Sequence, residues 1–224
     1  LYEQGLLEVN RAEMVMHPFH HHGDIPCYIP EKEDKKFFEA LENCTKRNTA
    51  ILLLARKLGL RSCDICNLKF SQIDWENDTI LLNQQKTGEP IVLPLLPEVG
   101  NAIFEYICDE RPKRNDNYPY IFLRTHAPFT KITRLYEISN QFIKESGIEQ
   151  KNGEQKGMHL YRRTLINRLL LDGVAHQVIT DTLGHTSKES DKPYIPMEEA
   201  MLRECALGLG KIGIKSWEGG EEDE

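Results

Sequence analysis

Apolar side chains recur at helical spacing through the first third of the chain. One stripe starts at the acidic turn 31–33 and runs to Leu41, and a second runs from 47 to 58. Acidic residues favour the start of a helix, and a glycine such as Gly59 is typical of a helix end. The pattern therefore predicts two helices, followed by a short break that contains Arg61.

The period of the apolar pattern changes after the next helix, which we expect to begin with Ser62 as its N-cap. Residues 79–83 and 90–94 read as two short strands, separated by the turn residues 86–89. Strands with such a turn between them predict a β-hairpin, with Lys86 near its tip.

Helical spacing returns after the hairpin. It predicts a helix at 99–108, with Phe104 among its inward residues, and another at 132–146. The polar stretch 111–120, which contains two prolines, is typical of a loop. The predicted fold class is therefore α+β, mainly α-helical with a small antiparallel β-sheet.

Composition is that of an ordinary globular domain. The chain has 224 residues, of which 40% are hydrophobic and 28% charged, enough for one substantial core. We find neither an apolar run of membrane-spanning length nor a charged leader, so we expect a cytoplasmic protein. The cysteines are scattered, and Cys63 and Cys66 are better explained as buried free thiols than as zinc ligands.

The net charge of −7 argues mildly against a nucleic-acid partner. However, the last seven residues, 218–224, carry five acidic and no basic side chains, which leaves −2 for the remainder. An acidic stretch of this kind is expected to be disordered, so it does not describe the folded surface. Composition therefore leaves DNA binding open.

Residues able to do chemistry gather late in the chain. His159 and Arg162 are three apart and share one face of a predicted helix. The sequence Leu-Gly-His at 183–185 predicts a glycine-capped helix end with His185 just beyond it, and Tyr194 follows. The buried side of this segment is predicted to consist of Leu165, Leu169, Val174, Ile179 and Leu183.

Each of these residues, taken alone, has an ordinary explanation. A His-x-x-Arg pair is most often a solvated helix face, surface tyrosines are common, and most hairpin lysines only add solubility. The ordered set is what distinguishes a functional site from these alternatives.

In order, the set resembles the signature of the tyrosine recombinases, the phage integrase family. ARKLGLRSCDICNLKFSQIDW is similar to the first arginine box of that family, with Asp64 as its acidic residue, and QQKTGEPIVLPL is similar to its lysine hairpin. The resemblance covers about 26–208. The positions that match the active set of the family are Arg61, Lys86, His159, Arg162, His185 and Tyr194.

The resemblance implies DNA strand cleavage through a 3′-phosphotyrosine, with no cofactor and no metal. Tyr194 would be the nucleophile, His159 the general base and Lys86 the acid that protonates the leaving 5′-oxygen. Arg61 and Arg162 would hold the phosphate. His185 would add a further hydrogen bond to a non-bridging oxygen. The acidic residues Asp74, Asp78, Asp181 and Asp191 read as turn or cap residues rather than metal ligands.

The same resemblance implies a domain organisation. Residues 1–25 would be the end of an N-terminal DNA-clamping domain plus a linker, 26–210 the catalytic domain and 211–224 an acidic tail. In this family the segment after the tyrosine often docks on a neighbouring protomer. The stretch 196–210 is therefore expected to support self-association on double-stranded DNA, as a tetramer.

The sequence leaves three other functions open. A type IB topoisomerase-like enzyme would use the same chemistry to nick and reseal DNA. A DNA-binding module of the same fold could have lost its chemistry, although all the matched positions are filled. A generic phosphate-binding domain would require the ordered pattern to be a coincidence.

Overall fold

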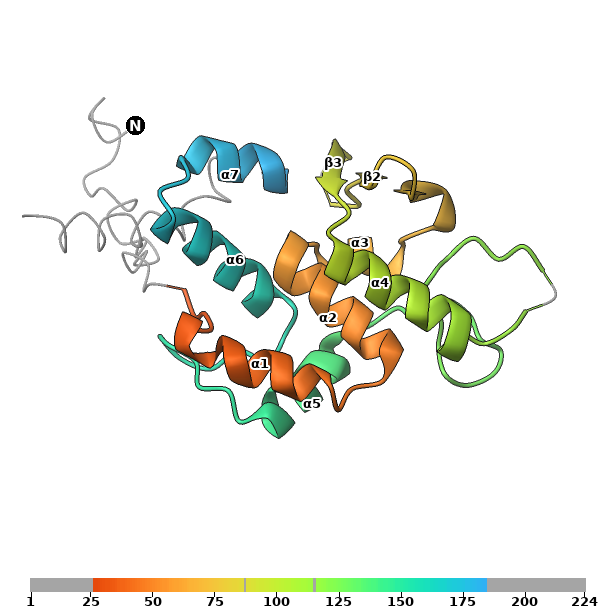
Figure 1. Ribbon diagram of the computed structural model, residues 1–224, viewed down its shortest axis with the longest axis horizontal. Coiled ribbons are helices and arrows are strands. Elements are labelled where there is room, and N and C mark those ends of the chain that lie inside the picture. Colours follow the sequence, from red (N-terminus) through yellow and green to blue (C-terminus); the bar gives the residue numbers. More distant parts are fainter. Residues whose placement is uncertain (1–25, 87, 115, 185–224) are drawn as a thin grey trace, which may run out of the picture.

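The computed structural model describes residues 26–86, 88–114 and 116–184 (Figure 1). Within these ranges it confirms the predicted fold class, a mainly helical domain with one three-stranded antiparallel sheet. The helices are α1 (Asp34–Leu41), α2 (Lys46–Leu58), α3 (Ser62–Cys66), α4 (Pro97–Glu105), α5 (Tyr136–Ser146), α6 (His159–Leu171) and α7 (His176–Leu183). The strands are β1 (Ile73–Asp74), β2 (Thr79–Asn83) and β3 (Pro90–Pro94).

Helix α2 is the centre of the helical body. It packs against α4 on one side and α6 on the other, and its residues 50–56 are all buried. A helix that is apolar on nearly every side has to be surrounded in this way. It ends at Gly59, whose φ of 62° closes the helix in the left-handed conformation, as predicted.

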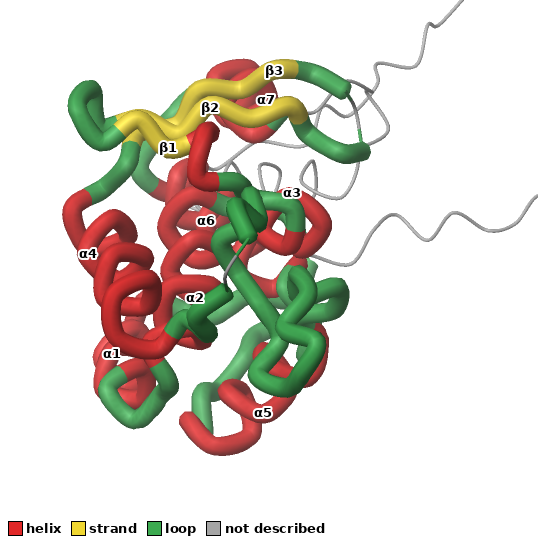
Figure 2. The backbone as a smooth tube through the Cα atoms, turned by 90° about the vertical axis from the view of Figure 1, so that its right-hand side faces the viewer, coloured by secondary structure: helices red, strands yellow, loops and turns green. Residues whose placement is uncertain are grey.

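The sheet lies across one end of this body, at the same end as α7 (Figure 2). Both predicted strands have the expected bounds, and they pair in the register Thr79 with Pro94 through Asn83 with Pro90. The side chains that alternate along them are buried on the face toward the helices, as the period of two requires. The third strand, β1, was not predicted, because two residues carry no periodic signal.

Helix α6 is tied to the rest of the body by polar contacts. Asp34 of α1 accepts a hydrogen bond of 2.8 Å from Arg56 of α2 and another from Arg168 of α6. The backbone N–H of Ile29 donates to the hydroxyl of Thr164 at 3.0 Å, where both groups are buried. These contacts fix α6 from two directions.

A smaller apolar cluster joins α6 to α7. Ile166 and Leu170 of α6 meet Ile179 and Leu183 of α7. Leu165, Leu169 and Val174 are partly buried and pack against this group. Of the predicted buried side, only Ile179 and Leu183 are therefore buried, and the buried positions on α6 belong to Ile166 and Leu170, which were not predicted.

Some predicted boundaries were wrong. The helix expected at 132–146 begins only at Tyr136, because the backbone N–H of Ile132 bonds to the Phe122 carbonyl at 3.0 Å in an extended pairing. Arg61 is the N-cap of α3, and Ser62 is its first helical residue.

The prediction that Phe104 points inward was also wrong. This side chain is 58% exposed and meets the ring of Trp75 edge to face, with 6.5 Å between the centroids. The predicted helix 99–108 covers two elements, because α4 ends at Glu105 and a π-helical turn, Tyr106–Glu110, follows it. No helix in the described ranges has the length and apolar character needed to span a membrane.

Candidate active site

Arg61 lies between α2 and α3 in an extended conformation, with φ of −72° and ψ of 151°. Helices α2 and α3 hold its backbone on either side, and its half-buried side chain extends toward the hairpin and the end of α7. One terminal nitrogen of the guanidinium donates to the side-chain oxygen of Gln84, and the other donates to the Gly184 carbonyl at 3.3 Å. Arg61 therefore connects the α2–α3 break to the hairpin and to the end of α7.

Arg162 reaches the same place from α6. Its side chain is buried, and its terminal nitrogens donate to the Gly59 carbonyl at 2.6 Å and to the Leu183 carbonyl at 2.8 Å. A buried guanidinium is stable only with such partners. Gly59 is two residues before Arg61, and Leu183 precedes Gly184, so both arginines meet at the C-terminal turn of α7.

His159 is the first residue of α6, one turn before Arg162, and it is exposed although Arg162 is buried. The pKa of His159 is lowered, first by partial desolvation and then by the nearby cations Arg163, Arg162, Arg61 and Lys86. The imidazole is therefore neutral at neutral pH and has cations around it. Such a group can accept a proton next to a bound anion.

Lys86 is exposed in the loop between β2 and β3. Its neighbour Gln85 donates its backbone N–H to a side-chain oxygen of Asp64 at 2.8 Å. Asp64 is buried in α3, three residues after Arg61. The acidic residue of the arginine box thus anchors the loop that carries the lysine, a role that the sequence alone did not indicate.

Gln84 is the residue that sequence reasoning missed. It is buried and contacts both Arg61 and the Leu183 carbonyl through its side chain. In the sequence it is only a polar residue after a strand, which is typical of any hairpin. Its burial depends on α7, a helix about 100 residues later in the chain, so no local pattern could have revealed it.

The structure thus brings Arg61, Lys86, His159 and Arg162 to one end of the domain. The remaining predicted site residues, His185 and Tyr194, lie outside the described residues. The described part of the chain ends at Gly184, directly before His185.

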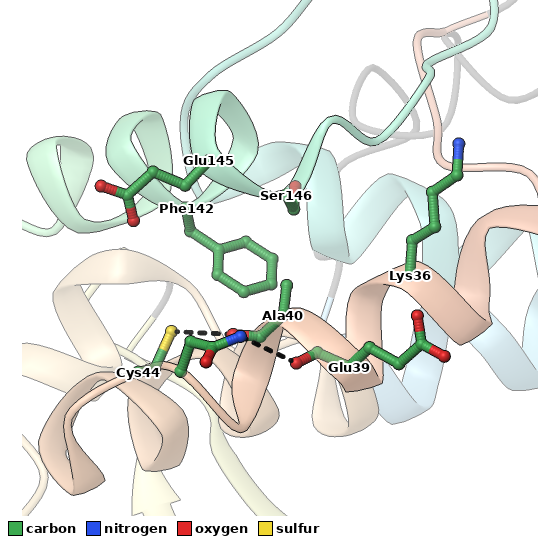
Figure 3. A pocket seen from close by; sticks show the side chains of 8 residues that line it. Lys36, Glu39, Ala40, Cys44, Phe142, Glu145 and Ser146 are labelled. Carbon is green, nitrogen blue, oxygen red and sulfur yellow. Dashed lines mark hydrogen bonds between the residues drawn. The ribbon is translucent and has the colours of Figure 1, made fainter.

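Other candidate groups lie away from this site. A hollow between α1 and α5 has the Phe142 ring and the Cys44 thiol on its walls, with Glu39 and Glu145 at its edge (Figure 3). Cys44 donates to the Ala40 carbonyl, and burial raises the pKa of its thiol. Helices α1 and α5 lie at the end of the domain opposite the sheet (Figure 1), and none of the predicted site residues lines the hollow between them.

The Cys63 and Cys66 thiols are free, and burial raises the pKa of Cys66 to about 11. Across the ranges that the structure describes, no three histidine, cysteine or acidic side chains gather where they could hold a metal ion. The prediction of metal-independent chemistry stays open to experiment.

Comparison with known proteins identifies the family of this chain. The model of the phage integrase family matches residues 28–200. The chain belongs to the phage integrase family. Tyrosine recombinase XerA of Pyrococcus furiosus is 28% identical over 185 residues, which cover 81% of this chain and 61% of that protein. The protein y4gC of Sinorhizobium fredii, which is named as an integrase/recombinase, is 34% identical over 163 residues, or 73% of this chain and 83% of that protein.

Solved structures of recombinases share the fold of this integrase-family chain. XerA recombinase superposes with a TM-score of 0.65 at 23% identity, covering 82% of this chain and 66% of that one. The site-specific recombinase XerH, bound to its difH substrate, gives a TM-score of 0.65 at 20% identity over 81% of this chain and 54% of that one. The chain therefore corresponds to a part of several of these longer proteins. The family and fold expected from the sequence motifs are confirmed.

Proposed function

We propose that this chain is the catalytic part of a site-specific DNA recombinase, an integrase or transposase of a mobile element. It would cleave and rejoin DNA strands through a 3′-phosphotyrosine intermediate. The observation that carries the proposal is the meeting of Arg61 and Arg162 at the end of α7, with His159 and Lys86 in electrostatic range. Membership of the phage integrase family supports the same conclusion.

The arginines would bind the scissile phosphate. Attack at phosphorus increases the negative charge on the non-bridging oxygens, and planar guanidinium groups match phosphate in charge and shape. A guanidinium has several N–H donors, so backbone carbonyls can hold Arg61 in place while phosphate oxygens are also bound. His185 would add a hydrogen bond to one of these oxygens.

Tyr194 would supply the nucleophile. Its phenol oxygen forms a bond to phosphorus while the bond from phosphorus to the 5′-oxygen breaks. The phenol proton passes to His159, which desolvation and the surrounding cations keep neutral, and a proton from Lys86 goes to the leaving 5′-oxygen. The phosphotyrosine conserves the bond energy, so a second DNA end can reverse the step without ATP or a metal ion.

Further parts of the proposal concern the whole protein. Residues 1–25 would connect to a DNA-clamping domain, and the segment 196–210 would dock on a neighbouring copy to form a tetramer on double-stranded DNA. The protein would act in the cytoplasm on nucleoid DNA. A type IB topoisomerase-like enzyme would act as a monomer instead.

The experiment is a covalent-trapping assay. A nicked suicide duplex that carries the end of the mobile element is incubated in EDTA with wild type or with Tyr194→Phe, then separated on a denaturing gel. We expect a slow-migrating protein–DNA band with wild type only. Absence of the band for both this chain and the full-length protein would favour an inactive DNA-binding module of the same fold.

A further inference from the structure

Gln84 closes the loop that carries Lys86. Its backbone N–H donates to the Glu89 carbonyl at 2.9 Å, and its own carbonyl accepts from the N–H of Gly88 at 2.8 Å. It follows β2 directly and is 1% exposed. The backbone of Gln84 is therefore fixed at the base of the hairpin loop, two residues before the lysine.

The side chain of Gln84 joins two other parts of the site. Its oxygen accepts from Arg61, and its nitrogen donates to the Leu183 carbonyl at 2.7 Å. A guanidinium can only donate and a carbonyl can only accept, so this is the only amide orientation that satisfies both partners. A side chain with both a donor and an acceptor is needed at this position.

The end of α7 is shaped to receive this amide. Gly184 has φ of 65°, and a Cβ atom there would lie 2.6 Å from the side-chain nitrogen of Gln84. No carbon atom fits at that distance. The amide of Gln84 therefore occupies the space that the missing side chain of Gly184 leaves, and the turn that leads into His185 packs directly on it.

We infer that Gln84 is a positioning residue that holds Arg61, the lysine loop and the end of α7 in one arrangement before the phosphate binds. The role rests on the proposed function, because it requires Arg61 to act on a phosphate. A long arginine side chain has many rotamers, and restricting them in advance avoids an entropic penalty in the transition state. A neutral amide does this without cancelling the positive charge of Arg61, which a carboxylate would do.

Two variants test the role. Gln84→Met keeps the length of the side chain but removes both hydrogen bonds, whereas Gln84→Glu keeps an acceptor for Arg61 and loses the donor to Leu183. Gln141→Met, on the exposed surface of α5, is the matched control. A cooperative, reversible unfolding transition of each variant shows that the variant is folded before its activity is compared.

The first measurement separates binding from cleavage. With Gln84→Met we expect the cleavage rate of bound suicide duplex to fall about tenfold to a hundredfold, the range that a small misplacement of a catalytic group produces. The Kd for DNA should change by less than about threefold, because one contact among many to phosphate is affected. Gln84→Glu should also cleave slowly, since its charge offsets that of Arg61. Cleavage by Gln84→Met or Gln84→Glu at the wild-type rate would overturn the inference.

The second measurement needs neither DNA nor activity. In NMR spectra of 15N-arginine-labelled protein, hydrogen bonds slow the rotation of the Arg61 guanidinium, whose signal is assigned with Arg61→Lys. We expect slow rotation in wild type, in Gln141→Met and in Gln84→Glu, and fast rotation in Gln84→Met. An unchanged signal in Gln84→Met would overturn the inference. Slow rotation without any covalent adduct in wild type would contradict the proposed function and leave the contact of Gln84 with Arg61 established.

Discussion

His159 shows how neighbouring charges adjust a single residue. Desolvation and then the cations Arg163, Arg162, Arg61 and Lys86 lower its pKa below the ordinary histidine value of about 6.5. A general base must be neutral, so we expect the cleavage rate to stay constant to a pH below 6.5 and fall only there. Removing one cation should raise the pKa and shift this fall to higher pH.

The variant Arg163→Gln tests this prediction, with Lys35→Gln on α1 as a control for a lost surface charge. The measurement is the single-turnover cleavage rate between pH 5 and pH 8. The same shift affects stability. Because the pKa of His159 is lower in the folded than in the unfolded protein, the unfolded chain takes up the proton first. The free energy of unfolding therefore decreases as pH falls from the ordinary histidine pKa toward the lowered one. A pH profile that Arg163→Gln leaves unchanged would exclude His159 as the titrating base.

Asp64 is expected to act through the lysine loop. Removing its contact with the Gln85 N–H should let Lys86 move away from the leaving oxygen. Asp64→Ala should slow cleavage by roughly tenfold, which is less than the rate acceleration of ~10²–10⁴ that a general acid contributes. A substrate with sulfur in place of the 5′-oxygen needs no proton to leave, so the defect should disappear on it.

Asp74→Ala is the matched control for Asp64, because Asp74 caps the turn between β1 and β2. It should leave cleavage unchanged on both substrates. If the sulfur substrate does not rescue Asp64→Ala, the residue acts on stability or on Arg61 and not through Lys86.

Among single residues, the sequence predicted the candidate site residues that lie in motifs, and it missed a residue whose contacts form only in the folded protein. Arg61, Lys86, His159 and Arg162 were predicted because they match ordered motifs, and the structure brings these four residues to one end of the domain. Gln84 was missed because it matches no sequence motif and its side-chain partners lie in distant segments of the chain. The catalytic roles of all six predicted residues, including His185 and Tyr194, stay predictions.

At the scale of single elements, the glycine ends of α5 and α7 provide a matched pair. Gly147 and Gly184 have φ of 60° and 65°, but a Cβ atom at Gly147 would meet nothing within 4 Å. Gly147→Ala should therefore lower the free energy of unfolding only by the strain of an alanine in the left-handed conformation, about 1 kcal/mol. Gly184→Ala should cost at least about 1 kcal/mol more, because the buried amide of Gln84 has to move.

Urea unfolding of both glycine variants measures this difference, and the covalent-trapping assay shows whether only Gly184→Ala loses cleavage. Equal losses of stability would mean that the amide of Gln84 moves aside without penalty. That result would also weaken the positioning role of Gln84.

A charged cluster of Asp34, Arg56 and Arg168 connects helices α1, α2 and α6. Asp34 pairs with both Arg168 and Arg56. The Arg56 side chain is 3% exposed, its guanidinium lies 5.8 Å from the centroid of the Phe37 ring, and burial lowers its pKa. Removing the carboxylate leaves a buried cation uncompensated, so Asp34→Ala should lower the free energy of unfolding by about 3 kcal/mol. Glu39→Ala, which breaks an exposed pair with Lys35 on the same helix, should lower it by less than about 0.5 kcal/mol. Thermal unfolding of the two variants compares them, and similar losses would contradict a structural role for the cluster.

Element boundaries were predictable where local chemistry decides them. Gly59 and Gly184 end their helices as expected, and the hairpin strands have the predicted bounds. The start of α5 was not predictable, because pairing of Ile132 with Phe122 extends residues that have a helical pattern. Phe104 is exposed on α4, where its neighbour is the Trp75 ring directly after β1, and β1 has too few residues to be seen in a sequence.

At the scale of the whole molecule, the site exists only where distant segments meet. Arg61 comes from the break between α2 and α3, Lys86 from the loop between β2 and β3, and His159 and Arg162 from α6. The carbonyls at the end of α7 hold both arginines together. The sequence predicted which residues would act, but the structure was needed to identify α7 as the element at which the two arginines meet.

The net charge of the whole chain is expected to affect its affinity for DNA. The chain has a net charge of −7, and five acidic residues at 218–224 account for most of it. These charges repel DNA phosphates at low salt, whereas at high salt screening limits the effect to a few ångströms. Deleting 218–224 should therefore strengthen DNA binding several-fold at low ionic strength, and the difference should vanish as salt rises. A full-length variant with the five acids changed to their amides should match the deletion if charge is the cause. If only the deletion strengthens binding, residues 218–224 weaken it by their bulk or by a specific contact and not by charge repulsion.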